Sequence, residues 1–187
     1  MKPLWSFLLA LSLAVAPAAA HADDRAVEVE VVDHDDGTRT LAHSAIVDAP
    51  PEKVWEAFST REGWKSWGVA FAEMDVRVGG TIESGYVPGA EAGDPRNIVH
   101  RILALVPNRL MVTRVEKAPE GGPVGMDVLG RLWAVYELEE LDEGRTRLTI
   151  SGHGYRDGQP DDGIIAFFEQ ANTASIEMMR TAIEAQD

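Results

Sequence analysis

The stretch that decides the fold reads VDAPPEKVWEAFST and covers residues 47–60. Proline lacks the backbone N–H that a strand needs for its ladder, so Pro50 and Pro51 end the extended segment before them. Pro51 also suits the first position of a helix, where that N–H would have no partner. Three apolar side chains then recur at the spacing of one helical face: Val54, Trp55 and Phe58. The stretch predicts a strand that stops against a short amphipathic helix.

Extended segments lie on both sides of this stretch. Upstream, AVEVEVV at 26–32 alternates apolar and acidic residues, and the turn composition HDDG separates it from TRTLAHSAIVDA. These two segments predict a hairpin. Downstream, REGWKSW predicts a second short helix, with Thr60 as its N-cap. Further strands are expected at 71–86, bent at Gly79-Gly80, and then at 97–107, 109–116, 131–141 and 145–155.

The last segment, from 163 to 186, contains no proline and predicts the one long helix. Its expected apolar stripe is Ile164, Phe167, Ala171, Ala174, Met178 and Ala182, widened by Phe168, Ser175, Met179 and Ile183. The residues from 117 to 130 predict an irregular connection. Because strands and helices are segregated along the chain, the fold class is α+β.

The N-terminal residues 1–22 predict a secretory signal peptide. Lys2 supplies the positive start, residues 4–16 the apolar core, and Ala20-His21-Ala22 the small-x-small cleavage site. A membrane anchor is the alternative, but the apolar run is shorter than the roughly 20 residues that span a bilayer. Cleavage after Ala22 would leave residues 23–187 as one domain in the periplasm or outside the cell.

The formal net charge of −14 and the absence of cysteine set the class of protein. An acidic surface repels phosphate backbones and anionic lipids, so we expect no nucleic-acid partner. We also expect no membrane span, because no segment after residue 22 is long and apolar enough to cross a bilayer. Without cysteine there are no disulfides, and packing alone must hold the fold. The acidic turn at 33–36 does not predict a calcium loop, because Gly37 stands where a ligand should be.

The order of these elements resembles the START-like, or SRPBCC, superfamily and its helix-grip fold. Within it, the chain is most similar to the branch of the activator of heat shock protein 90 ATPase. The segments that carry the resemblance are VDAPPEKVWEAF, REGWKSWGV with Trp64 and Trp67, DVRVGG, LVPNRLMVT and AVYELEELDEGRTRLTISGHGY. The resemblance covers about residues 40 to 185. It implies a curved antiparallel sheet wrapped around a long C-terminal helix, with two short helices after the first core strand.

Three features depart from that family. They are the signal peptide, the added N-terminal strand at 27–32, and Gly152 in place of a polar residue or histidine. An exported protein meets neither ATP nor the cytosolic chaperone, so the resemblance carries over the fold and not the chaperone role.

A curved sheet under a helix leaves room for a pocket lined by the inward faces. The expected lining is Trp64, Trp67, Phe71, Ile98, His100, Ile102, Ala134, Tyr136, Leu138, Phe168, Asn172, Ser175 and Met179, with Trp64, Trp67 and Phe71 near its mouth. Ordinary core is the alternative for each of these side chains. The leading interpretation is an exported protein that binds a small hydrophobic or amphipathic ligand, without cofactor or metal.

Two other interpretations stay open. The first is a cyclase or hydrolase acting on a polyketide-like or lipid-like substrate, with His100 or Tyr136 as the acid-base group. No motif for a serine or cysteine nucleophile, a phosphate loop or a metal helix supports it, and the histidines show no zinc spacing. The second is an interaction module that recruits another exported protein by strand addition at 27–32.

Overall fold

An eight-stranded antiparallel sheet and one long helix form the body of the structure. The computed structural model describes residues 25–185, so the predicted signal peptide lies outside the described residues. The strands run in the order β1-β2-β8-β7-β6-β5-β4-β3. Their bounds are β1 Glu28–Asp33, β2 Thr38–Val47, β3 Phe71–Met74, β4 Thr81–Gly85, β5 Ile98–Val106, β6 Leu110–Lys117, β7 Trp133–Glu140 and β8 Thr146–Arg156. The helices are α1 Pro51–Ser59, α2 Arg61–Lys65, α3 Met126–Leu129 and α4 Asp161–Glu184, and a 3-10 turn covers Asp142–Gly144.

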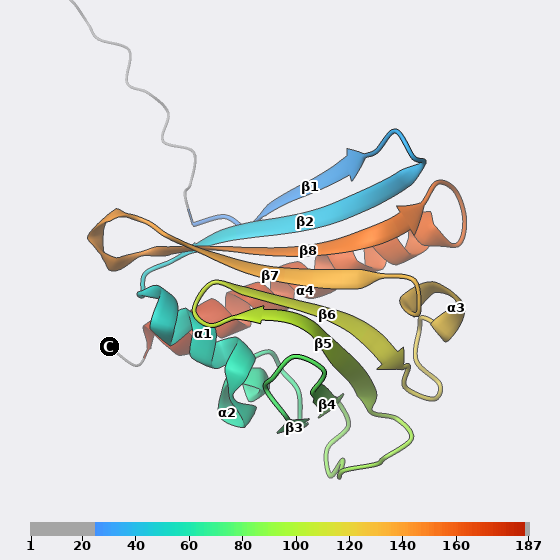
Figure 1. Cartoon of the computed structure of the whole chain (residues 1–187), viewed down its shortest axis with the longest axis horizontal. Helices are drawn as coiled ribbons and strands as arrows, with labels where there is room; N and C mark the ends of the chain where they lie inside the picture. Colours follow the sequence, from blue (N-terminus) through green and yellow to red (C-terminus); the bar gives the residue numbers. More distant parts are fainter. Residues whose placement is uncertain (1–24, 186–187) are drawn as a thin grey trace, which may run out of the picture.

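Helix α4 covers one face of the curved sheet (Figure 1). It lies behind β7 and β8 in this view and packs on β2, β8 and α1. The expected α+β helix-grip arrangement is therefore confirmed. No helix within residues 25–185 is long and apolar enough to cross a bilayer.

The stretch from 47 to 60 folds as its sequence indicates. Strand β2 ends at Val47 and α1 begins at Pro51, which lies at the helix N-terminus. The three apolar side chains of α1, Val54, Trp55 and Phe58, are buried. Thr60 caps α2, since its Oγ1 accepts a hydrogen bond from the backbone N–H of Gly63 at 2.9 Å. These contacts fix the two short helices against one end of the sheet.

The predicted N-terminal hairpin is present, because β1 pairs with β2 in register from Glu28 opposite Ser44 to Asp33 opposite Arg39. Strand β1 forms one edge of the sheet and β3 the other. Glu28 and Glu30 on β1 are exposed, as is common on edge strands, where charge discourages pairing with another chain. The segment from 117 to 130 was expected to be irregular but contains α3, which has only four residues and so shows no helical periodicity. The strand expected at 71–86 is instead two strands, β3 and β4, which pair antiparallel.

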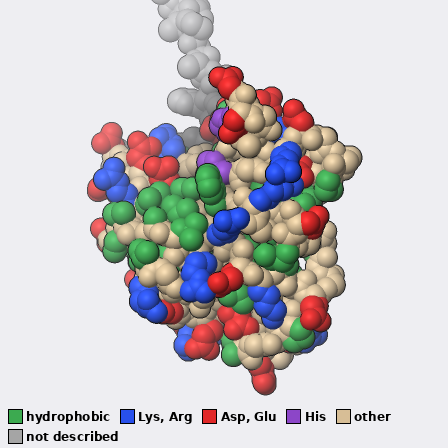
Figure 2. All heavy atoms as spheres, turned by 45° about the vertical axis from the view of Figure 1, so that its right-hand side comes forward, with side chains coloured by type: hydrophobic (Ala, Val, Ile, Leu, Met, Phe, Trp, Pro, Cys, Tyr) green, Lys and Arg blue, Asp and Glu red, His purple; other side chains and the backbone are tan. Residues whose placement is uncertain are grey.

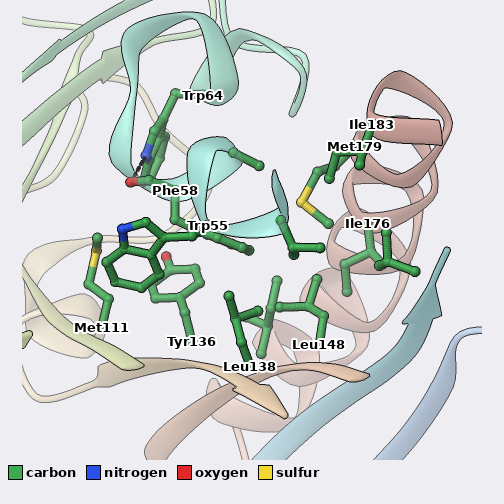
Figure 3. Packing of buried hydrophobic residues seen from close by; sticks show 14 of the residues in the cluster. Trp55, Phe58, Trp64, Met111, Tyr136, Leu138, Leu148, Ile176, Met179 and Ile183 are labelled. Carbon is green, nitrogen blue, oxygen red and sulfur yellow. Dashed lines mark hydrogen bonds between the residues drawn. The ribbon is translucent and has the colours of Figure 1, made fainter. Parts of the chain in front are cut away.

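The hydrophobic core consists of two clusters. The larger cluster fills the space between α1, α2, the sheet and the C-terminal half of α4 (Figure 3); it includes Trp55, Phe58, Trp64, Met111, Tyr136, Leu138, Leu148, Ile176, Met179 and Ile183. The smaller cluster surrounds α3 and the start of α4; its buried members are Leu41, Val124, Val128, Leu129, Leu132, Tyr155 and Ile165.

The expected apolar stripe of α4 was placed wrongly. Phe167 is 44 % exposed and Met178 47 % exposed, whereas Ile165 and Ile176 are buried. Met179 and Ile183 are buried as well, so the packed face is rotated from the predicted one toward its widening residues. Apolar side chains occur on several sides of this helix, and contact with the sheet decides which of them are covered.

Candidate functional site

A cavity of about 190 Å³ lies between the sheet and α4. Its walls come from both core clusters: Trp64, Tyr136 and Ile150 belong to the larger one, and Leu132 and Tyr155 to the smaller. The cavity therefore occupies the region where the two clusters do not meet. Interiors of small domains are otherwise close-packed, so an opening of this size is a feature that needs a reason.

The structure brings nine of the thirteen predicted lining residues together around this cavity. They are Trp64, Trp67, Ile98, His100, Ala134, Tyr136, Phe168, Asn172 and Ser175. Those on α4 are spaced by four and then three residues, which puts them on one face of the helix. Ala134 and Tyr136 on β7 are two positions apart, so they share one face of the strand.

The other four predicted residues do not line the cavity. Ile102, Leu138 and Met179 are buried in the larger core cluster. They pack in the same cluster as Trp55 and Phe58 of α1, where side chains fill the space. Phe71 lies half-buried on the edge strand β3, opposite Gly85, and does not belong to the lining.

The two tryptophans, which were expected near the mouth of the cavity, line it; Trp64 is buried and Trp67 is partly exposed. Trp64 is only 5 % exposed, and its Nε1–H donates a hydrogen bond to the carbonyl oxygen of Phe58 at 2.9 Å, drawn as a dashed line in Figure 3. Trp67 Nε1–H donates to the carbonyl oxygen of Ala57 at 2.9 Å. Both bonds reach back to the last turn of α1, so each indole ring is held in place.

Ten lining residues were not predicted: Tyr86, Thr113, Val115, Leu129, Leu132, Trp133, Ile150, Ser151, Gly152 and Tyr155. Thr113 and Val115 lie two positions apart on β6, and Ile150 and Gly152 lie two positions apart on β8. The alternation of side chains along each strand could therefore have predicted them. Leu129 and Leu132 come from α3 and the residues after it, for which the sequence shows no periodic signal. Tyr86 is 62 % exposed and lies at the rim of the cavity.

The cavity contains titratable groups that are held neutral. Burial lowers the pKa of His100 to about 4 and raises the pKa of Tyr136 to about 12. The pKa of the Tyr86 phenol is also raised, because its surroundings desolvate the phenol even though the residue as a whole is largely exposed, and a charge on Tyr86 would further oppose ionisation of Tyr136. Around neutral pH, all three side chains are therefore uncharged.

His100 lies at the aromatic end of the cavity, with its ring centroid 6.0 Å from that of Trp64. Its Nδ1 is buried without a hydrogen-bond partner, whereas the Thr113 hydroxyl acts on the Tyr136 phenol. In the described part of the chain, no hydrogen bond joins His100 to a carboxylate, so the imidazole lacks the acidic partner that commonly orients a catalytic base. Residues 25–185 also contain no group of three or more side chains that could hold a metal ion.

His153 is held by polar contacts beside Trp133. Its Nε2 lies 2.8 Å from Ser151 Oγ and its Nδ1 lies 3.0 Å from Thr40 Oγ1, and its ring centroid is 6.1 Å from that of Trp133. Thr40 Oγ1 also lies 2.7 Å from His34 Nε2 in the β1–β2 turn. Figure 2 shows histidine side chains at the surface beside a group of hydrophobic ones. This chain of contacts ties the N-terminal hairpin to β8.

Solved structures of low sequence identity share the fold. Protein MLL2253 from Mesorhizobium loti is 19% identical, with a TM-score of 0.62 over 80% of this chain and 99% of that one. CalU16 from Micromonospora echinospora, in its solution structure, is 18% identical, with a TM-score of 0.59 over 87% and 76%. The Aha1 dimer from Colwellia psychrerythraea is 18% identical, with a TM-score of 0.54 over 75% and 92%. At such identities the likeness shows the fold alone.

Comparison with curated proteins gave no significant match. The sequence profile of one family, by contrast, matches most of the chain. That family is described as Activator of Hsp90 ATPase homolog 1-like protein, and the match covers residues 48–184, from the end of β2 to the last residue of α4. The match includes α1, α2 and every element that lines the cavity. The chain therefore belongs to the Activator of Hsp90 ATPase homolog 1-like family, within the SRPBCC superfamily.

Proposed function

We propose that the protein binds a small hydrophobic or amphipathic molecule in the cavity between the sheet and α4. The observation that supports this most is the division of the core, because an opening of about 190 Å³ separates two well-packed clusters. Concave, largely apolar sites with a few polar groups are the usual form of small-molecule pockets. Family membership adds the fold in which such a cavity can form.

Binding fits the cavity better than catalysis does. A general base works best with a pKa near the operating pH, whereas the pKa of His100 is about 4 and that of Tyr136 about 12. The backbone of Ile82 raises the pKa of His100 and the Thr113 hydroxyl lowers that of Tyr136, but burial outweighs both contacts. We therefore assign His100 and Tyr136 to the wall of a binding site.

Replacing Ser175 by leucine tests the proposal, because Ser175 lines the cavity and leucine would occupy part of it. We expect S175L to lower the affinity for small apolar probes such as toluene by at least about tenfold. Filling an empty cavity should leave the free energy of unfolding unchanged or raise it by up to about 1 kcal/mol. Isothermal titration and urea unfolding measure the two quantities.

The matched control is A174L, since Ala174 is the neighbouring residue on α4 and is exposed. It should keep the affinity of the unchanged protein. If the interior is solid, leucine at Ser175 overpacks it, and S175L instead loses about 1–3 kcal/mol of stability. That result, together with no toluene uptake by the unchanged protein, would refute the proposal.

We further propose that the protein acts outside the cytoplasm after cleavage following Ala22. The support is the charge, length and cleavage pattern of residues 1–22. Intact mass and N-terminal sequencing of the protein from a periplasmic or culture fraction of its own host should give Asp23 as the first residue. Recovery of the full chain from the cytosol alone would contradict this.

A further inference from the structure

The size of the cavity limits its ligand. An engineered cavity of about 150 Å³ in another protein stays dry and accepts benzene. At about 190 Å³, the present cavity has room for one ring and a small substituent. Several walls are aromatic, with Trp64, Trp67, Tyr136 and Phe168 among the lining residues. Aromatic side chains pack well against another ring in offset or edge-to-face geometry.

The charge of the walls limits the ligand further. None of the nineteen lining residues is Asp, Glu, Lys or Arg, although 26% of the chain is charged. An ionic group in such a site would lose its hydration without gaining a counter-charge. His100 and Tyr136 offer no compensation, because both are neutral around pH 7. The site therefore favours an uncharged molecule.

Asn172 adds a polar side chain to the wall of the cavity. It lies one turn beyond Phe168 and one turn before Ser175 on the cavity face of α4, and it is half-buried. No hydrogen bond joins its side chain to another group in the described part of the chain. An amide offers two donors and one carbonyl acceptor. In a cavity wall these groups are available to a ligand that carries a hydroxyl or carbonyl group.

We infer that the ligand is a neutral molecule with a single aromatic ring and one hydroxyl or carbonyl group, and that Asn172 determines the preference for that polar group. This inference rests on the proposed function and specifies the class of ligand. The Nδ1 of His100 gives the aromatic end a further polar atom without a hydrogen-bond partner. A bound hydroxyl group that reached it would remove part of its desolvation penalty.

Three probes with the same ring test the inference: p-cresol, toluene and 4-methylbenzoate. Titration calorimetry gives the affinity of each for the unchanged protein and for N172L, in which leucine replaces the amide with an apolar side chain of similar size. We expect the ratio of the p-cresol affinity to the toluene affinity to fall about tenfold in N172L. The charged 4-methylbenzoate should bind the unchanged protein most weakly of the three. The p-cresol affinity should stay constant between about pH 5.5 and 8.5, since no lining group changes its charge in that range.

The control is Q170L, because Gln170 is exposed on the same helix and away from the cavity; it should keep the original ratio. The inference fails if N172L leaves the ratio unchanged, if 4-methylbenzoate binds tightest, or if the two-ring 1-naphthol outcompetes p-cresol. In each of those cases the proposed function survives, because a ligand is still bound. If the unchanged protein binds none of the four probes, the inference and the proposed function both fall.

Discussion

Replacing Asp161 by alanine is expected to lower the free energy of unfolding by about 3 kcal/mol. Asp161 lies in the first turn of α4, and its side chain is only 3 % exposed. Its Oδ1 accepts a hydrogen bond from Arg131 Nη2 at 2.6 Å, and its Oδ2 accepts one from the backbone N–H of Arg156 at 2.7 Å. The carboxylate therefore joins the start of α4 to the end of β8 and to the residues before β7.

The size of the effect follows from what the substitution leaves behind. Burial by itself raises the pKa of Asp161, but the hydrogen bonds from Arg131 and from the Arg156 N–H outweigh it and hold the pKa below its ordinary value. Alanine would leave the partly buried Arg131 without its counter-charge and the Arg156 N–H without an acceptor. Leu132 and Tyr155, each next to one of these groups, line the cavity, so its wall should loosen as well.

The control for this prediction is D162A at the adjacent residue. Asp162 Oδ1 accepts a hydrogen bond from Arg39 Nη2 at 2.6 Å, but its side chain is 44 % exposed, so the pair contributes about 1 kcal/mol or less. Both variants remove one negative charge from the first turn of α4, and any effect of the helix dipole is common to them. Urea unfolding at pH 7 measures both variants. Equal losses of stability would show that the buried contacts of Asp161 are unimportant.

His100 should make the stability of the protein depend on pH. Burial lowers its pKa to about 4 in the folded state, whereas an unfolded histidine has a pKa near 6.5. Between these values the unfolded chain binds a proton that the folded chain does not. Stability is therefore fully present above about pH 6.5 and is lost as the pH falls toward 4.

The variant H100Q removes this titration and keeps a neutral polar side chain of similar size. Relative to H100Q, the unchanged protein should lose about 2–3 kcal/mol of unfolding free energy between pH 7 and pH 4.5. Urea unfolding of both proteins at both pH values gives this difference, and the comparison cancels the contribution of the carboxylates. Parallel losses of stability would mean that the imidazole of His100 reaches water in the folded state.

The sequence was sufficient to predict the fold because local and global signals agree. The two prolines end β2 and open α1, and Thr60 caps α2 as its position indicates. The alternation of side chains along a strand identified the inward faces of the central strands, and His100, Ala134 and Tyr136 were therefore placed together. Each of these inferences needs only neighbouring residues along one element.

The sequence could not predict in the same way which inward-facing residues line the cavity and which are buried in the core. Ile102 follows His100 on the same face of β5, yet it is fully buried in the larger cluster while His100 lines the cavity. What separates them is the packing of distant elements, and alternation along β5 carries no information on that. Leu129 was missed because α3 is too short to show a pattern, and the α4 stripe was misplaced because apolar residues occur around much of that helix.

Diffraction from a crystal of the protein under xenon pressure tests the central claim most directly. Xenon enters apolar cavities that water leaves empty, and its electron density locates them. The account predicts a xenon site in contact with Tyr136, Ile150 and Phe168, between the two core clusters. A structure in which these three side chains close on one another and no xenon binds inside would contradict it.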